Sequence, residues 1–310
     1  MTAIEFRWGP QSWSLSVLKG EKAMEKPRKI GPYVVLREIG KGGMATVYEA
    51  ELSSGDNHVA LKVAHSDQSD FLKDEAENLV TLVTILDHPN ILKILPLPLG
   101  KGEKDYYIAR DPKTNNWYIA LEYIDGGSLR DKLNQEKRIE LREAIEIISQ
   151  VGSALDYAHS KGIIHRDIKP TNILFQRLPS GETRVLLSDF GIARARVLEG
   201  VKGIIGTPCY MSPEQASGKD VDHRTDIYSL GVVLYEMLTG GVPFEGTMPD
   251  VMHQHIYQPP PPPSGISPYI PREVETVIMK ALAKNPEDRF QSVKEMIAAL
   301  QEAIKAKSSR

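Results

Sequence analysis

The sequence has almost no cysteine and no long apolar run, and both absences limit what the protein can be. Its 310 residues include one cysteine, Cys209, which excludes an intramolecular disulfide and a cysteine-based zinc site. No stretch reaches the roughly 18 apolar residues that a membrane helix needs. The first residues also lack the basic start and apolar block of a signal peptide. We therefore expect no membrane segment in this chain and a cytoplasmic location.

The sequence also lacks an excess of either charge. It has 38 Lys and Arg against 41 Asp and Glu, for a formal net charge of -3 at pH 7. Nucleic-acid-binding domains usually carry a basic patch, and no run of Lys and Arg forms one here, so we expect no nucleic-acid partner. The 41% hydrophobic content is enough for one large domain or two modest ones.

The first 29 residues differ from the rest because they show no periodicity, although they contain Trp8 and Trp13. We expect a flexible extension there; the alternative is a docking arm whose tryptophans fill a groove. From Tyr33 onward, β-branched runs separated by turn residues predict antiparallel strands, and one helix is expected among them. The expected strands cover 33–40, 45–52, 58–64, 91–97 and 117–123, the helix covers 70–86, and the polar segment 100–116 is expected to be a long hairpin loop.

After Gly126 the pattern becomes helical. Ala144, Ile148, Val151, Leu155 and Ala158 follow helical spacing on one face, and the segment TDIYSLGVVLYEMLTG is apolar nearly all round, which predicts a buried helix. The proline-rich segment QPPPPPSGISPYIP is expected to be an extended connecting loop; the alternative is a ligand for a proline-binding domain. A last helix is expected with Val293, Met296, Ile297, Leu300 and Ile304 on one face.

This arrangement predicts an α+β protein with two lobes and a cleft between them. We expect an extension at 1–29, a small antiparallel-sheet lobe with one long helix at 30–124, a larger helical lobe at 125–305 and a tail at 306–310.

A glycine-rich turn, IGKGGMATVY, lies between the first two expected long strands. Glycines let backbone amides approach phosphate oxygens closely. The next element is a strand and not a helix, which argues against a dinucleotide-binding fingerprint. The candidate phosphate-covering residues are Ile39, Gly40, Lys41, Gly42, Gly43, Met44, Ala45, Thr46 and Val47.

Lys62 lies inside the expected strand VALKV among apolar neighbours, so it needs a buried anionic partner or a phosphate. The expected helix at 70–86 offers Glu75 as that partner, with Glu77 as the alternative.

The strongest signal is HRDIKPTN, residues 165–172, which follows an amphipathic helix and precedes a strand. Phosphoryl transfer requires mainly positioning and charge neutralisation. Asp167 would accept the proton of the attacking hydroxyl, or at least orient that hydroxyl in line. Lys169 would neutralise charge on the phosphoryl group, and Asn172 would hold a magnesium ion.

The segment LSDFG follows, in which Asp189 is the second candidate magnesium ligand. Farther on, GTPCYMSPE supplies Thr207 for a loop that grips the acceptor. Glu214, in the same segment, is expected to pair with the distant Arg289. Cys209 is interpreted as a small apolar side chain in the acceptor groove rather than a redox site.

Together these motifs resemble the eukaryotic-type protein kinase family over residues 33–305, and they look most like its bacterial serine/threonine branch. The resemblance implies ATP and Mg²⁺ as cofactors and proteins with Ser or Thr acceptors as partners. Lys169, two positions after Asp167, is typical of serine/threonine kinases. The resemblance further implies an adenine site between Val47 and Ala60 above and Leu174 below, Leu121 as gatekeeper, and hinge hydrogen bonds from the backbone of Glu122 and Ile124.

The sequence departs from the family pattern in the activation loop. Residues 192–205, IARARVLEGVKGII, contain no Ser, Thr or Tyr, so the usual phosphorylation switch cannot act there. We hypothesise that Glu199 supplies a permanent negative charge for Arg166; the alternative is that it is only a solvated loop residue. A pseudokinase without turnover is the alternative function, and a homodimer is left open.

Overall fold

The structure is a computed structural model, and it describes residues 28–42, 45–55, 58–65, 85–98, 106–190 and 208–308. Some predicted features lie outside these ranges: residues 1–27, Gly43, Met44, most of the helix predicted at 70–86 with Glu75 and Glu77, residues 191–207 with Glu199 and Thr207, and residues 309–310.

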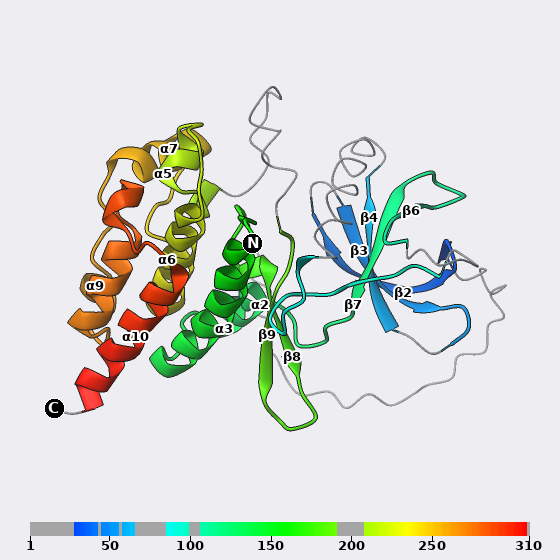
Figure 1. Ribbon diagram of the computed structural model, residues 1–310, viewed down its shortest axis with the longest axis horizontal. Coiled ribbons are helices and arrows are strands. Elements are labelled where there is room, and N and C mark those ends of the chain that lie inside the picture. Colours follow the sequence, from blue (N-terminus) through cyan, green and yellow to red (C-terminus); the bar gives the residue numbers. More distant parts are fainter. Residues whose placement is uncertain are drawn as a thin grey trace, which may run out of the picture.

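The N-terminal lobe is built on one antiparallel sheet (Figure 1). Most side chains of β3 and β4 are buried, whereas those of β2 are mostly half-buried or exposed. The strands are β1 (Lys29–Ile30), β2 (Tyr33–Lys41), β3 (Ala45–Leu52), β4 (His58–Ala64), β5 (Ile94–Leu95), β6 (Ala109–Arg110) and β7 (Trp117–Glu122). Their order is β1-β2-β3-β4-β7-β5, with β6 also paired to β7.

One expectation for this lobe is wrong. The polar segment 100–116 was expected to be loop throughout, but β6 within it pairs with Tyr118 and Trp117 of β7. The buried carboxylate of Asp111 accepts hydrogen bonds from the backbone N–H and the hydroxyl of Thr114, and this fixes the turn between the two strands. The polar composition therefore reflects a tight, hydrogen-bonded hairpin end.

The C-terminal lobe is helical, with a two-stranded hairpin at its junction with the sheet lobe. Its elements are α2 (Leu129–Glu136), α3 (Leu141–Ser160), η2 (Pro170–Asn172), β8 (Ile173–Arg177), β9 (Thr183–Leu187), η3 (Pro208–Tyr210), α5 (Pro213–Ala216), α6 (Arg224–Thr239), α7 (Met248–Tyr257), α8 (Pro263–Ile266), α9 (Arg272–Ala281), η4 (Pro286–Asp288) and α10 (Val293–Ser308).

Helix α6 lies at the centre of this lobe and is buried from Thr225 to Thr239, as its all-round apolar sequence predicted. It ends at Gly240, whose φ of 86° is the left-handed conformation that glycine adopts without strain. Helix α3 buries the predicted face, including Ile148, Val151 and Leu155. Both helices share one hydrophobic core with α9 and α10.

The proline-rich segment is not extended throughout. Residues 258–262 belong to no helix or strand, but Pro263 opens the one-turn helix α8. Proline is compatible with the first turn of a helix because its missing N–H is unpaired there anyway. The segment connects α7 to α9, and Pro260 and Pro263 are buried against the lobe.

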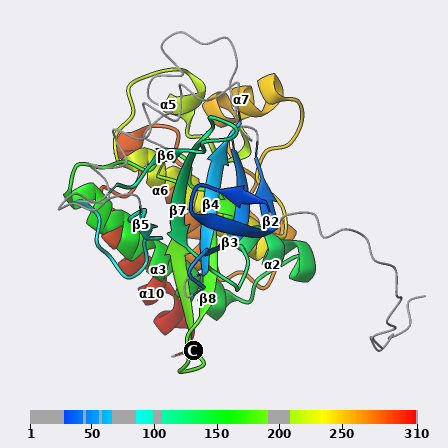
Figure 2. The ribbon, with the colours of Figure 1, turned by 90° about the vertical axis from the view of Figure 1, so that its right-hand side faces the viewer.

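The two lobes meet at the hairpin β8–β9, which lies between the sheet and the helices of the C-terminal lobe in Figure 1; in Figure 2 the sheet faces the viewer. The partly buried side chains of Leu86 and Phe190 pack against the cores of both lobes. Among the described residues, no helix combines the length and apolarity that crossing a membrane requires.

Candidate active site

A cleft of about 490 Å³ lies between the lobes, and most of the predicted nucleotide-binding residues line it. Its roof comes from β2, β3 and β4, its rear from the segment that joins the lobes, and its floor from β8 and the residues after β9. The predicted residues that line it are Ile39, Gly40, Val47, Ala60, Lys62, Leu121, Glu122, Ile124, Leu174 and Asp189.

Strand register explains the roof of this cleft. Val47 is paired with Lys62, and Ala60 is paired with Leu121. Of the other predicted flap residues, Lys41 is paired with Thr46, and Gly42 N–H donates to the Ala45 carbonyl at 2.9 Å. The Thr46 side chain is buried, with its hydroxyl 3.0 Å from His65 Nε2, so this hydroxyl is not a cleft-lining group.

The segment that joins the lobes is held in place from both sides. Glu122 N–H donates to the Lys93 carbonyl at 2.9 Å, and the Glu122 side chain forms an ion pair with Arg184 of β9. Gly126 lies so close to β8 that an added Cβ would stand 2.1 Å from the Phe175 carbonyl oxygen. Only glycine fits at this crossing, which brings Leu174 under the cleft.

The segment HRDIKPTN forms a compact polar cluster at the front of the C-terminal lobe. Lys169 Nζ donates to Asp167 Oδ2 at 2.8 Å, and Asn172 Nδ2 donates to the Asp167 carbonyl at 2.8 Å. Asp167 N–H in turn donates to His165 Nδ1 at 3.2 Å. The three predicted catalytic side chains are thus brought together, with the Asp167 carboxylate between the lysine and the amide.

His165 connects this cluster to the segment that carries Asp189. Its ring is fully buried, and its Nε2–H donates to the Ser188 carbonyl at 2.9 Å. Burial lowers the pKa of His165, so the ring stays neutral with Nδ1 as an acceptor. The ring also packs against Phe190, with centroids 4.6 Å apart.

Asp226, which the sequence analysis did not single out, anchors the catalytic loop. It lies in the first turn of α6 and is fully buried. Its two carboxylate oxygens accept from the backbone N–H groups of His165 and Arg166, each at 2.8 Å, and from His159 Nε2 at 2.8 Å. These bonds hold the loop while Arg166 takes a φ of 64°, a conformation that is unfavourable for a residue with a Cβ. An acidic residue in the first turn of a helix that is predicted to be buried was the signal that could have identified it.

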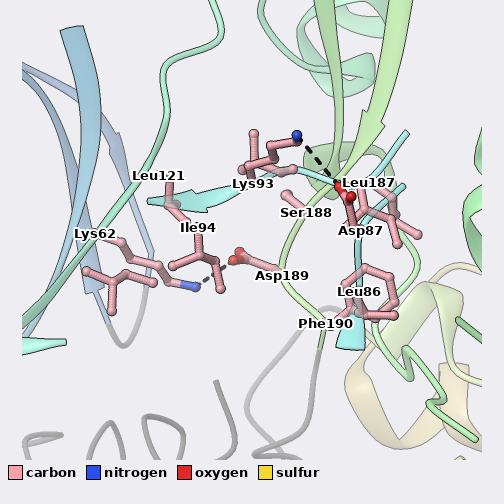
Figure 3. A pocket seen from close by; sticks show the side chains of 13 residues that line it. Lys62, Leu86, Asp87, Lys93, Ile94, Leu121, Leu187, Ser188, Asp189 and Phe190 are labelled. Atoms are coloured by element: carbon pink, nitrogen blue, oxygen red, sulfur yellow. Dashed lines mark hydrogen bonds and ion pairs between the residues drawn. The ribbon is translucent and has the colours of Figure 1, made fainter. Parts of the chain in front are cut away.

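Lys62 and Asp189 meet across the cleft. Lys62 Nζ lies 2.7 Å from Asp189 Oδ1 (Figure 3). Burial alone would raise the pKa of Asp189, but the Lys62 ammonium outweighs it, with smaller contributions from His165 and Lys169, and holds that pKa below its usual value. Asp189 is therefore ionised and also has a φ of 58°, a second unfavourable backbone conformation in the site.

The side chains of Asn172 and Asp189 fit a divalent ion chemically. Because Asn172 Nδ2 is used by Asp167, its Oδ1 is the end of the amide that can coordinate a metal, and Asp189 supplies an ionised carboxylate. Hard oxygen ligands of this kind suit Mg²⁺. Within the described ranges there is no cluster of three or more His, Cys, Asp or Glu placed to hold a metal.

A second cavity, of about 310 Å³, adjoins the cleft and shares Lys62, Leu121 and Asp189 with it. Figure 3 shows its lining, in which Ile94 and Leu121 stand beside Lys62 while Leu86 and Phe190 lie beyond Asp189.

The segment from Pro208 to Glu214 is anchored from several helices. Tyr210 O–H donates to Glu236 of α6 at 2.7 Å, and Arg130 of α2 pairs with the same carboxylate at 2.9 Å. Glu214 and Arg289 form a bidentate ion pair with distances of 2.7 and 2.8 Å, as predicted. Burial would raise the pKa of Glu214, but the Arg289 hydrogen bonds hold it below its usual value.

Cys209, in the same segment, is partly buried and packs against the C-lobe core. Burial raises the pKa of its thiol, which disfavours the reactive thiolate. This agrees with the interpretation of Cys209 as a packing residue.

The comparisons with known proteins agree with this geometry. Residues 33–301 match the family model described as the protein kinase domain. The serine/threonine-protein kinase PknB of Mycolicibacterium smegmatis is 41% identical over 290 residues, which cover 89% of this chain and 44% of that protein. A probable serine/threonine-protein kinase of Clostridium perfringens is 37% identical over 287 residues, covering 88% of this chain and 38% of that protein.

The chain therefore spans less than half the length of these curated relatives. Among solved structures, the kinase domain of Mycobacterium tuberculosis PknI has a TM-score of 0.68 and 27% identity, and the match covers 91% of this chain and 100% of that one.

Proposed function

The chain belongs to the protein kinase family, in its bacterial serine/threonine branch, and on that premise we propose that it transfers the γ-phosphoryl group of Mg-ATP to Ser and Thr hydroxyls of proteins. Family membership implies ATP and a divalent metal in general, and Mg²⁺ is the specific ion that we propose. The observation that carries the proposal is the cluster in which Asp167 Oδ2 accepts from Lys169 Nζ at 2.8 Å. This pair supports the proposal because a carboxylate that can accept a hydroxyl proton lies beside an ammonium cation.

The roles of the residues follow from what the reaction needs. The acceptor hydroxyl oxygen forms a bond to the γ-phosphorus, the bond from phosphorus to the β–γ bridging oxygen breaks, and ADP leaves. Asp167 orients the hydroxyl and receives its proton, and Lys169 neutralises charge on the phosphoryl group during transfer. Lys62 positions the phosphates, and the flap between β2 and β3 covers them.

Asn172 and Asp189 are the residues that we propose hold the metal. The ion supplies charge neutralisation at the phosphate oxygens. In the structure Asp189 is paired with Lys62, so the same two side chains can hold each other or hold the phosphates and ion.

The remaining assignments are proposals of the same kind. The nucleotide lobe is 30–124 and the acceptor lobe is 125–305, although strand β1 begins at Lys29, one residue before the predicted boundary. Adenine would lie between Val47 and Ala60 above and Leu174 below. Use of ATP as donor favours a cytoplasmic location.

The alternative of a pseudokinase is disfavoured by the side chains that are present. Lys62, Asp167, Asn172 and Asp189 are all in the sequence, and loss of one of them is the usual mark of a kinase fold without turnover. Mapping of phosphate on Ser or Thr of a protein acceptor after incubation with Mg-ATP, with an Asp189→Ala variant as control, distinguishes the two.

A further inference from the structure

A buried histidine on α7 binds the backbone of the segment from Pro208 to Glu214. His255 is fully buried. Its Nε2 lies 3.1 Å from the Cys209 carbonyl oxygen, and its Nδ1 lies 2.8 Å from the Tyr228 hydroxyl. A carbonyl oxygen only accepts, so Nε2 carries the hydrogen and Nδ1 accepts from the tyrosine O–H. Both ring nitrogens are satisfied by a single neutral tautomer.

The surroundings of His255 keep it in that state. Burial, followed by the like charge of Lys284, lowers its pKa to about 4. The Lys284 ammonium donates to the His255 carbonyl at 2.8 Å, and Arg289 stacks over Tyr228 at 4.9 Å while pairing with Glu214. The ring of Phe244 packs against that of His255 in a T-shaped contact, with centroids 5.0 Å apart. The imidazole therefore acts as a fixed hydrogen-bond donor.

The bond to Cys209 is one of two that fix consecutive carbonyls. Ser229 Oγ of α6 donates to the Tyr210 carbonyl at 2.7 Å, next to the Cys209 carbonyl held by His255. Both carbonyls lie in η3, directly after Thr207, in the segment that the resemblance assigns to gripping the acceptor. The side chain of Tyr210 is held separately by Glu236 and Arg130. Loss of the His255 side chain would thus remove the hydrogen bond to the Cys209 carbonyl and leave the bonds to the Tyr210 carbonyl and side chain in place.

Resting on the proposed function, we propose that His255 is a positioning residue for the protein acceptor. Through the Cys209 carbonyl it sets the path of η3 and hence the surface against which the acceptor chain lies. Neither His255 nor Cys209 lines the nucleotide cleft. A substitution at His255 should therefore change activity towards the protein acceptor and leave ATP binding unchanged.

The test compares two amides at position 255. The amide nitrogen of Gln reaches about as far as Nε2 of histidine and can donate to Cys209, whereas that of Asn reaches about as far as Nδ1 and cannot. For His255→Asn we expect kcat/KM for a protein acceptor such as myelin basic protein to fall about tenfold, equivalent to about 1.4 kcal/mol. We expect His255→Gln to keep most of the wild-type kcat/KM for the acceptor. The ATP Kd should be the same in the Asn and Gln variants as in the wild type. His253→Asn, at an exposed position on the same helix, is the matched control.

The only cysteine of the chain gives a readout that does not depend on catalysis. Cys209 is partly buried, so its rate of reaction with a thiol reagent such as DTNB reports how firmly η3 is held. The rate should rise in His255→Asn and stay near that of the wild type in His255→Gln and His253→Asn. Tyr228→Phe keeps the histidine but removes the hydroxyl that fixes its tautomer, so the rate of thiol reaction should rise less than in His255→Asn. This variant replaces His255→Asn in the test if His255→Asn fails to fold.

Equal behaviour of the Asn and Gln variants, or an unchanged acceptor kcat/KM and thiol rate in His255→Asn, would overturn the inference. If the wild type transfers no phosphoryl group at all, the proposed function fails on its own, and the thiol rates alone decide whether His255 anchors η3.

Discussion

Lys62 and Asp189 form a direct ion pair across the interlobe cleft, with 2.7 Å between Nζ and Oδ1. The sequence analysis assigned the first to the phosphates and the second to the metal. In this pair the Lys62 ammonium and the Asp189 carboxylate neutralise each other. Under the proposed function, binding of Mg-ATP would replace this pair by contacts with the phosphates and the magnesium ion.

Removal of the lysine charge should affect turnover more than nucleotide affinity. For Lys62→Met we expect kcat to fall roughly 100-fold to 1,000-fold, because a preorganised charge beside the reacting group is lost. The ATP Kd should change by less than about tenfold, since adenine contacts remain. Steady-state kinetics and titration of a fluorescent ATP analogue measure the two quantities. A large loss of affinity with unchanged kcat would mean that Lys62 only binds substrate.

Asp167→Asn keeps the shape of the catalytic loop but removes the proton acceptor. We expect kcat to fall roughly 100-fold to 10,000-fold, with the ATP Kd nearly unchanged, because this carboxylate is not among the residues that line the nucleotide cleft. Asp220→Asn, at an exposed position on the same lobe, is the control and should behave as the wild type. Near-normal turnover of Asp167→Asn would show that the catalytic residues are wrongly assigned.

Asp226→Asn should weaken the support of the catalytic loop. An amide can accept only through Oδ1, so its Nδ2 would face a backbone N–H of His165 or Arg166 without a bond between them. We expect a loss of about 1–3 kcal/mol in the free energy of unfolding, together with a lower kcat. Urea unfolding and kinetics on the same preparation measure both. A stability loss without any change in kcat would show that the loop geometry does not depend on these bonds.

The Glu214–Arg289 pair should matter for folding. Arg289 is almost fully buried and also donates to the carbonyls of Ala283, Arg224 and Lys284. Arg289→Ala leaves a buried carboxylate without its partner, so we expect a loss of about 3–5 kcal/mol in urea unfolding. Lys93→Ala breaks the exposed pair with Asp87 and should cost less than about 1 kcal/mol. Similar losses for the two variants would contradict the structural role of the buried pair.

The stability of the protein should depend on His255 at acid pH. The pKa of His255 is about 4 in the folded chain, against 6.5 for an ordinary histidine. Between these values the unfolded chain binds a proton that the folded chain does not, so the free energy of unfolding falls as the pH falls from 6.5 towards 4. The full effect is roughly 3 kcal/mol at 1.36 kcal/mol per pKa unit. The neighbouring Lys284, with a pKa lowered to about 8, stays charged throughout this window.

Urea unfolding at pH 7, 6, 5 and 4.5 measures this dependence. The wild type should lose more stability than His255→Gln over the range, because glutamine does not titrate. Parallel losses in the two proteins would show that His255 is not the group responsible.

The sequence was most informative where a few adjacent residues carry the chemistry. Asp167, Lys169 and Asn172 lie within six positions, so a short loop brings them together, and the structure has the expected cluster. The buried face of α3 and the all-round burial of α6 likewise follow from local periodicity. The pairing of Glu214 with Arg289 was also predicted, although 75 positions separate them, because the motifs that contain these residues and not periodicity indicated it.

What the sequence could not indicate are pairings that only the folded chain creates. The bonds of Asp226 to the backbone at 165 and 166, of His255 to Cys209, and of Arg130 to Glu236 join residues 46 to 106 positions apart. Composition also gave a wrong prediction at β6 and at α8, where we expected loops. Polar residues at the end of a tight hairpin and proline at the start of a helix have the same composition as a loop. These features depend on tertiary hydrogen bonds and on position within an element rather than on local preference.

The most direct test of the account is phosphosite mapping by mass spectrometry after the purified protein is incubated with Mg-ATP and myelin basic protein. The account predicts phosphate on Ser or Thr of the acceptor, with none in an Asp189→Ala control. No transfer by the wild type despite measurable ATP binding would contradict it and would favour a nucleotide-binding protein without turnover.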